Sequence, residues 1–199
     1  MKQKIAIIDP LGAHGSSHHF YLFGQAKGLI NCGVDVCLYT NKETKNPKIK
    51  GLKFYPFYGN LFSSSFKTIS GIKYILGSIF SVFHARISGY TIVHFHIFYT
   101  NILVFFNLLL VKLFLGKVVL TIHDVSSFVG DKESSTIIKW IYKFTDLILT
   151  HNEFSKTEIL KISSFYSPKL NIVPHGNYIP FIEIEKDKLV SRAKLSIPE

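Results

Sequence analysis

The chain has 199 residues, of which 47% are apolar and 15% aromatic, and its 23 Lys and Arg residues against 13 Asp and Glu residues give a formal net charge of +10. This composition is too apolar for a disordered tail, and the length suits one globular domain. Two cysteines, Cys32 and Cys37, are too few for a disulfide framework or a four-thiolate zinc site, so we expect reduced core thiols in a cytoplasmic protein.

Short β-branched segments alternate with helical ones along the chain. The segments expected to be strands are residues 4–9, 34–40, 52–57, 91–97, 118–124, 147–151 and 170–174, and those expected to be helices are residues 18–31, 66–86, 101–115, 134–144 and 155–163, with a short charged helix over 186–195. Several strands are apolar on both faces, which is typical of strands covered by helices on two sides. The sequence therefore predicts an α/β fold with a Rossmann-like, doubly wound, mostly parallel sheet of about seven strands.

No segment is typical of a signal peptide or of a membrane span. The apolar run near the N-terminus is only four residues long. The most apolar stretch, residues 102–115, is interrupted by Asn107 and Lys112 and is shorter than the roughly 20 residues that a spanning helix needs. We therefore expect a chain that does not cross a membrane.

The positive charge is concentrated in one part of the chain. No acidic residue lies between Glu43 and Asp124, whereas nine Lys and Arg residues fall in that interval. Nucleic acid is not expected as a partner, because only Arg86 and Arg192 are arginines, the residue type that clamps phosphates and reads guanine edges.

The same interval contains an amphipathic segment. Large apolar residues recur at helical spacing from residue 66 to residue 83, and Lys67, Lys73 and Arg86 lie mostly on other faces. An apolar stripe with a cationic flank suits the surface of an anionic bilayer. A helix that packs on its own sheet has the same pattern, so both interpretations stand at this stage.

The residues that follow the predicted strands are candidates for a site, because ligands of such sheets bind at the carboxyl ends of the strands, where strand order reverses. After the first strand, Gly12 and Gly15 permit tight turns, and free N–H groups there, together with Ser16 at the start of the next helix, would face an anion. The turn lacks the G-x-G-x-x-G fingerprint, and the second strand ends in TNK rather than in an acid, so no nicotinamide cofactor is expected.

Histidines recur at the ends of the later strands. His94 and His96 point to one face of the fourth strand, and we expect His94 to be a core residue and His96 to face a crevice. This H-x-H pair offers two zinc ligands, but no further ligand motif accompanies it, so no metal is expected. His123 and Asp124 end the fifth strand as a titratable pair, either structural or functional. The other cleft candidates are His18, His151, Glu153, His175, Gly176 and Asn177.

Four stretches together resemble the N-terminal half of a GT-B glycosyltransferase, namely the Gly-rich turn, IVHFH, VVLTIHD with the polar loop after it, and LTHNEFSKTEI leading to NIVPHGNY. In their order and spacing over residues 4–178 they are most similar to the family-four, retaining, nucleotide-sugar-dependent enzymes of bacterial polysaccharide assembly. The resemblance implies a Rossmann-like, acceptor-side domain over residues 1–178, an exit segment over residues 179–199, and a nucleotide sugar bound mainly by a second domain across a cleft.

The resemblance also implies residue roles. It places Gly12 and Gly15 near the donor diphosphate, although the loop reads LGAHG in place of the usual paired glycines. It has His123 reach the transferred sugar, and it makes His175, Gly176 and Asn177 the cleft wall or hinge. The nucleotide diphosphate sugar is a co-substrate, and no cofactor is implied.

Nothing after Gly176 supplies the second Rossmann unit, so we expect a C-terminal donor domain in cis or in trans and no sugar transfer by this chain alone. The leading hypothesis is the acceptor half of an enzyme that moves a hexose onto a lipid-linked saccharide, peripheral to the inner face of the cytoplasmic membrane. The alternative is a non-catalytic Rossmann-like module that docks on the membrane and recruits a separate catalytic subunit. A nucleotide-binding regulator is a more distant interpretation.

Overall fold

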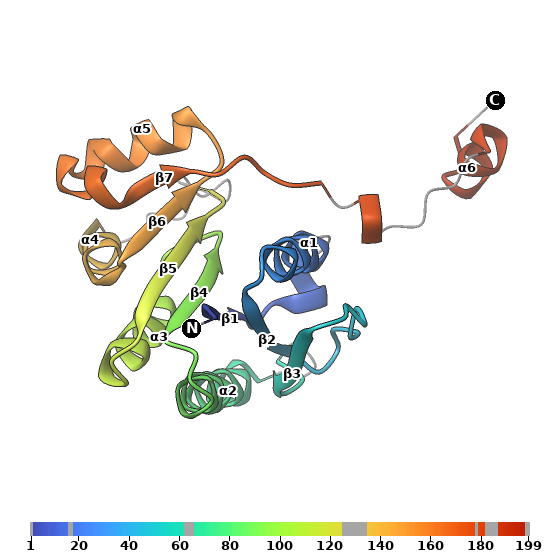
Figure 1. Cartoon of the computed structure of the whole chain (residues 1–199). Coiled ribbons are helices and arrows are strands. Elements are labelled where there is room, and N and C mark those ends of the chain that lie inside the picture. Colours follow the sequence, from blue (N-terminus) through green and yellow to red (C-terminus); the bar gives the residue numbers. More distant parts are fainter. Residues whose placement is uncertain are drawn as a thin grey trace.

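A seven-stranded, all-parallel sheet runs through the computed structural model, which describes residues 2–15, 18–61, 66–124, 135–177, 179–181 and 187–197 (Figure 1). The strand order is β3-β2-β1-β4-β5-β6-β7, so the order reverses between β1 and β4. The predicted α/β, Rossmann-like sheet is confirmed. The strands are β1 (Lys4–Asp9), β2 (Asp35–Asn41), β3 (Leu52–Tyr58), β4 (Ile92–Ile97), β5 (Lys117–Ile122), β6 (Leu147–Thr150) and β7 (Leu170–Ile172).

Helices cover both faces of the sheet (Figure 1). One face carries α1, and the other carries α2 and α3 side by side, with α4 next to α3. The helices are α1 (His18–Asn31), α2 (Lys67–Ile87), α3 (Ile102–Leu113), α4 (Ser135–Phe144), α5 (Glu153–Ile162) and α6 (Lys188–Lys194), and 3₁₀ turns span Gly12–Gly15, Ser164–Lys169 and Ile179–Phe181. Every predicted strand and helix begins and ends within two residues of these bounds.

Side-chain alternation along the strands sorts the core into two layers. In β1, Ile7 packs with α1, whereas Ala6 and Ile8 belong to the layer under α2 and α3. In β4, the odd-numbered residues, among them Phe95, lie in that second layer. By the same alternation His96 faces α1, and this is how the fold places the histidines of the strands.

The α2 helix packs on the sheet through small residues and turns large apolar ones outward. Its buried residues are Gly77, Ser78, Ser81, Val82 and Ala85. Gly77 lies so close to the fully buried Tyr58 that a Cβ there would be 2.5 Å from the Tyr58 ring. The stripe noted in the sequence is therefore mostly exposed, with Phe66 at 68%, Ile72 at 59% and Phe83 at 46%. The helix therefore packs on its own sheet, as one of the two interpretations expected, but it does so through small residues and not through the apolar stripe.

Arg86, one of the cations expected to face a membrane, supports the fold. Its guanidinium donates to the backbone carbonyls of Phe114, Tyr90 and Leu115 at 2.8, 3.0 and 3.5 Å. These bonds join the end of α2 to the turn after α3. Lys73 likewise donates from Nζ to the Asn60 carbonyl, at 3.1 Å, so these bonds do not separate the three cations, and Lys67, Lys73 and Arg86 all remain candidates for the membrane-facing role.

The two cysteines differ in their surroundings. Cys37 is fully buried in β2, where burial raises the pKa of its thiol to about 12, whereas Cys32 is exposed after α1 and so is not the core residue that we expected. Both are free thiols. Among the described residues, no helix combines the length and the apolar character that crossing a bilayer requires.

Candidate functional site

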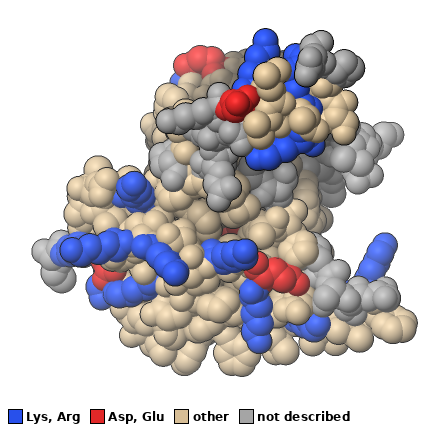
Figure 2. Space-filling model, turned by 90° about the vertical axis from the view of Figure 1, so that its right-hand side faces the viewer, with Lys and Arg blue, Asp and Glu red and all other residues tan. Residues whose placement is uncertain are grey.

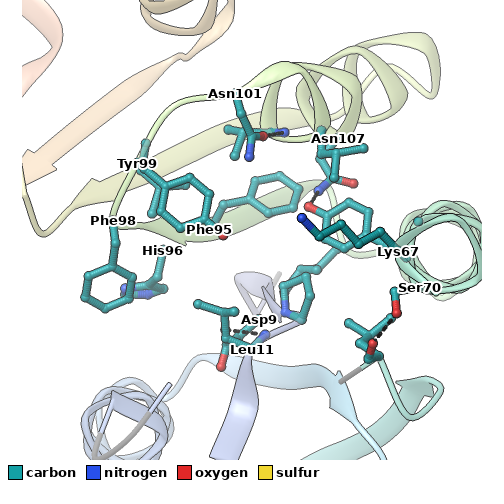
Figure 3. Close-up of a pocket in the computed structure, with 18 residues that line it drawn as sticks. Asp9, Leu11, Lys67, Ser70, Phe95, His96, Phe98, Tyr99, Asn101 and Asn107 are labelled. Carbon is teal, nitrogen blue, oxygen red and sulfur yellow. Dashed lines mark hydrogen bonds between the residues drawn. The ribbon is translucent and has the colours of Figure 1, made fainter. Parts of the chain in front are cut away.

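A pocket of about 660 Å³ opens at the point where the strand order reverses (Figure 3). The ends of β1 and β4 form its floor, and the first two turns of α2 and α3 form its walls, so it lies where such sheets usually bind ligands. Apolar side chains make up most of the lining. The polar side chains among them are Asp9, Lys67, Ser70, Tyr74, His96, Tyr99, Asn101 and Asn107.

One wall of the pocket carries an unpaired acceptor. Asn107 is 2% exposed, and its Nδ2 donates to the Tyr74 hydroxyl at 2.6 Å. Its Oδ1 has no hydrogen-bond partner among the described residues. The Lys67 side chain lies across the pocket beside it (Figure 3). Because a buried polar atom without a partner costs about 1–3 kcal/mol, Asn107 is well placed to accept from a ligand hydroxyl.

The turn after β1 uses its backbone amides within the fold. The Leu11 and Gly12 N–H groups donate to the Asp9 carboxylate at 3.2 and 2.9 Å, and the Ala13 N–H donates to Thr44 Oγ1 at 3.0 Å. The His14 N–H donates to the Leu11 carbonyl at 3.0 Å. The free N–H groups expected at residues 11–14 are therefore absent. Gly15 ends this 3₁₀ turn, and Ser16 lies outside the described residues.

Gly12 and Asp9 hold this turn in place. Gly12 has φ +48°, and a Cβ there would lie 1.9 Å from Thr44 Oγ1, so only glycine fits. Asp9 is 1% exposed, and burial raises its pKa to about 6 despite the two N–H groups that stabilise the anion. Gly12 therefore serves the geometry of the turn, and Asp9 brings a carboxyl that titrates near neutral pH to the pocket.

Three imidazoles bond in series along the carboxyl ends of β4, β5 and β6, on the α1 side of the sheet. His96 Nδ1 lies 3.1 Å from His123 Nε2, and His123 Nδ1 lies 3.2 Å from His151 Nε2. Oxygen acceptors end the series, with Gln25 Oε1 at 3.0 Å from His96 Nε2 and the Val173 carbonyl at 2.9 Å from His151 Nδ1. We call this arrangement the histidine series. Both ring nitrogens of His123 are thus in use.

Further rings surround the histidine series. The Tyr21 ring of α1 lies 4.5 to 5.9 Å, between centroids, from five imidazoles. Phe98 stacks on His123 at 4.6 Å, and the His18 ring meets His123 edge-on at 4.7 Å. His175 packs on His151 at 4.8 Å. Predicted cleft residues from five separate segments therefore meet at one place.

Burial favours the neutral form of His18, His96, His123 and His151. It lowers the pKa of His18 to about 4 and that of His123 to about 2, with neighbouring histidines adding to both shifts, and it holds the pKa of His96 well below its usual range. His94 lies behind His96 as the expected core residue, with its Nε2 2.8 Å from Thr121 Oγ1 and its pKa lowered to about 3 by burial.

The remaining predicted residues lie at the margin of the site. Asp124 is half-buried after β5, and Glu153 is exposed at the start of α5, where it pairs with Lys156 at 4.0 Å. Gly176 and Asn177 are exposed and cross α1 near Tyr21 and Gly24.

Sequence reasoning missed two α1 residues of the site, Tyr21 and Gln25. A signal existed, because His18, Tyr21 and Gln25 are spaced at i, i+3 and i+7 and so share one helix face.

The chain resembles solved structures in its fold. It superimposes on the lipopolysaccharide outer core galactosyltransferase WaaB with a TM-score of 0.57, 12% identity and coverage of 94% of this chain and 50% of the other. It superimposes on the E. coli trehalose-6-phosphate structure bound with UDP-2-fluoro glucose with a TM-score of 0.56 and 11% identity, covering 98% of this chain and 55% of the other. It superimposes on the UDP-GlcNAc 2-epimerase of Methanocaldococcus jannaschii with a TM-score of 0.54 and 12% identity, covering 87% of this chain and 45% of the other.

These matches show a GT-B-like half. The chain spans about half the length of each of the three structures, as expected for one of the two Rossmann-like units of that fold. No family model and no curated protein matches the sequence.

Acidification should destabilise the fold through the buried histidines. A histidine whose folded pKa lies below its unfolded value binds fewer protons when folded, so its contribution to stability is present above about pH 6.5 and is lost as the pH falls. Each histidine that stays neutral in the folded chain lowers the free energy of unfolding by about 1.4 kcal/mol at pH 5.5. Asp9 has a raised folded pKa and acts in the opposite direction, offsetting less than about 1 kcal/mol at that pH.

Urea unfolding at pH 7.5 and 5.5 measures this effect. We expect the free energy of unfolding to fall by about 3 kcal/mol or more, from the four histidines with strongly lowered pKa values less the Asp9 offset. Equal stability at the two pH values would show that these imidazoles are not held neutral.

Proposed function

We propose that this chain is the acceptor-side half, over residues 1–178, of a glycosyltransferase that resembles the family-four, retaining enzymes. The co-substrate is a nucleotide diphosphate sugar bound mainly by a C-terminal donor domain in cis or in trans. The acceptor is a lipid-linked saccharide of cell-surface polysaccharide synthesis, and the chain works while peripheral to the inner face of the cytoplasmic membrane. The GT-B-like fold and the edge pocket support this assignment.

The observation that carries the proposal is that one pair of helices forms both the pocket and an exposed apolar surface. Lys67, Ser70 and Tyr74 of α2 and Asn107 of α3 line the pocket. On their outer sides the same helices expose large apolar residues, and we call this area the α2–α3 apolar surface. Its members include Phe66, Ile69, Ile72, Leu76, Phe80, Phe83, Ile102, Leu109 and Leu113.

The charge around this surface suits an anionic bilayer. The α2 helix lies at the bottom of Figure 1 and so at the bottom of Figure 2, where the surface is largely tan, with Lys and Arg side chains above it and few acidic ones. Large exposed apolar areas on a folded chain mark contact surfaces. Lysines beside such an area each add about 1 kcal/mol of attraction to anionic lipid. A lipid-linked acceptor anchored in that bilayer would have its polar end next to the pocket mouth.

The pocket also suits an acceptor chemically. Its apolar lining would cover the part of the acceptor nearest the lipid, and the unpaired Asn107 Oδ1 would accept from a sugar hydroxyl. Lys67 would attract an acceptor diphosphate. His123 is the candidate to contact the transferred sugar, and because both of its nitrogens are in use, such a contact would require it to exchange His96 or His151 for the sugar. Asp124, beside it, has no role that the geometry singles out.

Charge reversal on α2 tests the membrane part of the proposal. In co-sedimentation with vesicles of phosphatidylcholine and an anionic lipid, the variant Lys67→Glu/Lys73→Glu should bind on the order of 10-fold or more weakly than the unchanged chain, since each lysine near the surface contributes about 1 kcal/mol. The matched control is Lys156→Glu/Lys161→Glu on α5, which has the same net charge and lies at the opposite end of the sheet (Figure 1). Equal loss in the two variants, or no binding by the unchanged chain, would contradict membrane docking through α2.

Filling the pocket tests the acceptor part. Gly71 lines the pocket, and a Cβ there meets nothing within 4 Å, so Gly71→Trp should obstruct the pocket and leave the fold intact. Vesicles that also carry a polyprenyl diphosphate saccharide should bind the unchanged chain more tightly than vesicles without it. Gly71→Trp should abolish that difference.

Gly28→Trp, at an equally open helical position of α1, serves as the control and should retain the difference. Membrane binding that never responds to the saccharide would contradict the acceptor assignment and favour the alternative, a docking module that recruits a catalytic subunit.

A further inference from the structure

A buried imidazole beside the histidine series has no partner. His18, at the start of α1, is 7% exposed, and its Nε2 makes no hydrogen bond to any described residue. One ring nitrogen from each of His18, His96 and His123 lies within 4.8 Å of those of the other two. Most buried polar atoms in folded proteins are paired, and each exception calls for an explanation. A missing ligand would explain this one.

Counting N–H groups along the histidine series shows that one donor is missing. The series contains four contacts, and its two outer acceptors, Gln25 Oε1 and the Val173 carbonyl, cannot donate. Four contacts need four N–H groups, whereas three neutral imidazoles supply three. One contact must therefore bring two lone pairs together unless something else enters.

The outer contacts decide which nitrogens carry lone pairs. His96 gives its N–H to Gln25 from Nε2, so its Nδ1 is a lone pair, and His151 gives its N–H to Val173 from Nδ1, so its Nε2 is a lone pair. His123 can donate to either neighbour. When it donates from Nδ1 to His151, the lone pairs of His96 Nδ1 and His123 Nε2 face each other at 3.1 Å, and when it donates from Nε2 to His96, those of His123 Nδ1 and His151 Nε2 face each other at 3.2 Å. A cation satisfies such a contact, and His18 supplies a third lone pair nearby.

We propose that His18, His96 and His123 bind one divalent transition-metal ion of the zinc class. The 3.1 Å between His96 Nδ1 and His123 Nε2 is close to the separation of about 3.3 Å between two nitrogens that each lie 2.0–2.1 Å from a tetrahedral ion. Imidazole donors favour zinc, cobalt, nickel or copper over magnesium and calcium, which prefer oxygen. The inference goes beyond the proposed function, and its test needs no sugar transfer.

The surroundings of the three nitrogens are those of an orienting outer shell. Metal-bound histidines usually donate their other N–H to a carbonyl or a comparable acceptor, and here Gln25 accepts from His96 and His151 accepts from His123. Three protein ligands leave a fourth coordination position. His96 also lines the pocket, so that position would be close to a molecule bound there. The site was not predicted from the sequence, because only the H-x-H pair is local.

Two other arrangements compete with this site. A second set of nitrogens, from His123, His151 and His175, also lies within 4.8 Å, and it uses a more exposed part of the cluster. Alternatively, the Gln25 amide can rotate and donate the fourth N–H, which completes the series with no metal. Each of these arrangements predicts a different experimental outcome.

Metal titration of the untagged, metal-stripped chain tests the site. Calorimetry with Zn²⁺ should show one ion per chain, Co²⁺ should give the visible absorption of a low-coordinate nitrogen site, and Mg²⁺ should give neither. His18→Ala should weaken Zn²⁺ binding by more than the about 10- to 100-fold that loss of an outer-shell partner causes, and Gln25→Leu should weaken it within that range. His175→Ala is the matched control and should bind Zn²⁺ as the unchanged chain does.

Thermal unfolding of the metal-free variants separates loss of the site from loss of the fold. His18→Ala removes an unpaired polar atom at the end of a helix, so its metal-free form should be folded and should no longer gain stability from Zn²⁺, as the unchanged chain should. Loss of binding in His175→Ala but not in His18→Ala would move the ion to the other set and overturn the proposal. No binding of Zn²⁺ or Co²⁺ by the unchanged chain would also overturn it and would assign the fourth N–H to Gln25.

Discussion

Three imidazoles bonded in series hold the carboxyl ends of β4, β5 and β6 against α1. They are brought together by strand alternation, which places His96, His123 and His151 on the face opposite the layer that contains Phe95, Leu120 and Ile148. Charged forms are disfavoured there because burial lowers the pKa of each ring. The edge of the sheet therefore presents lone pairs and N–H groups instead of charges. The count of N–H groups and the choice of ligand at the site both depend on these rings being neutral.

The two faces of the sheet carry different features of the molecule. On the α1 face, the histidine series and Tyr21 make an aromatic cluster, crossed by the exit segment near Gly24. On the other face, small residues of α2 let that helix approach Tyr58 closely and turn its large side chains outward. The pocket lies between these two systems and shares His96 with the first. A change at the pocket can therefore reach the histidine series through His96, and also through Phe98, which lines the pocket and stacks on His123.

Local sequence pattern was sufficient for the elements and for predicting that the candidate histidines lie at one edge of the sheet. Apolar runs and glycine and serine boundaries fix strands and helices, and the carboxyl ends of the strands gather His96, His123, His151 and His175 as expected. The hydrogen-bond partners of these groups could not be predicted from the sequence, because they come from distant segments. Thr44 accepts a hydrogen bond from the Ala13 N–H, although the two residues are 31 positions apart in the sequence. Gln25 contacts His96, which is 71 positions away. The direction in which the α2 stripe faces was also open, since helical spacing defines a stripe but not what covers it.

Nitrogen NMR of the His123 ring tests the central claim, a neutral imidazole whose two nitrogens face His96 and His151. In protein labelled with ¹⁵N-histidine, the account predicts one N–H nitrogen and one lone-pair nitrogen, unchanged between pH 7.5 and 5.5, because the pKa of this ring lies at about 2. It also predicts that these nitrogens sense both His96 and His151, so that replacing either neighbour shifts one of them. A His123 ring that becomes an imidazolium with a midpoint near pH 6.5, the usual value for an exposed histidine, would contradict the account.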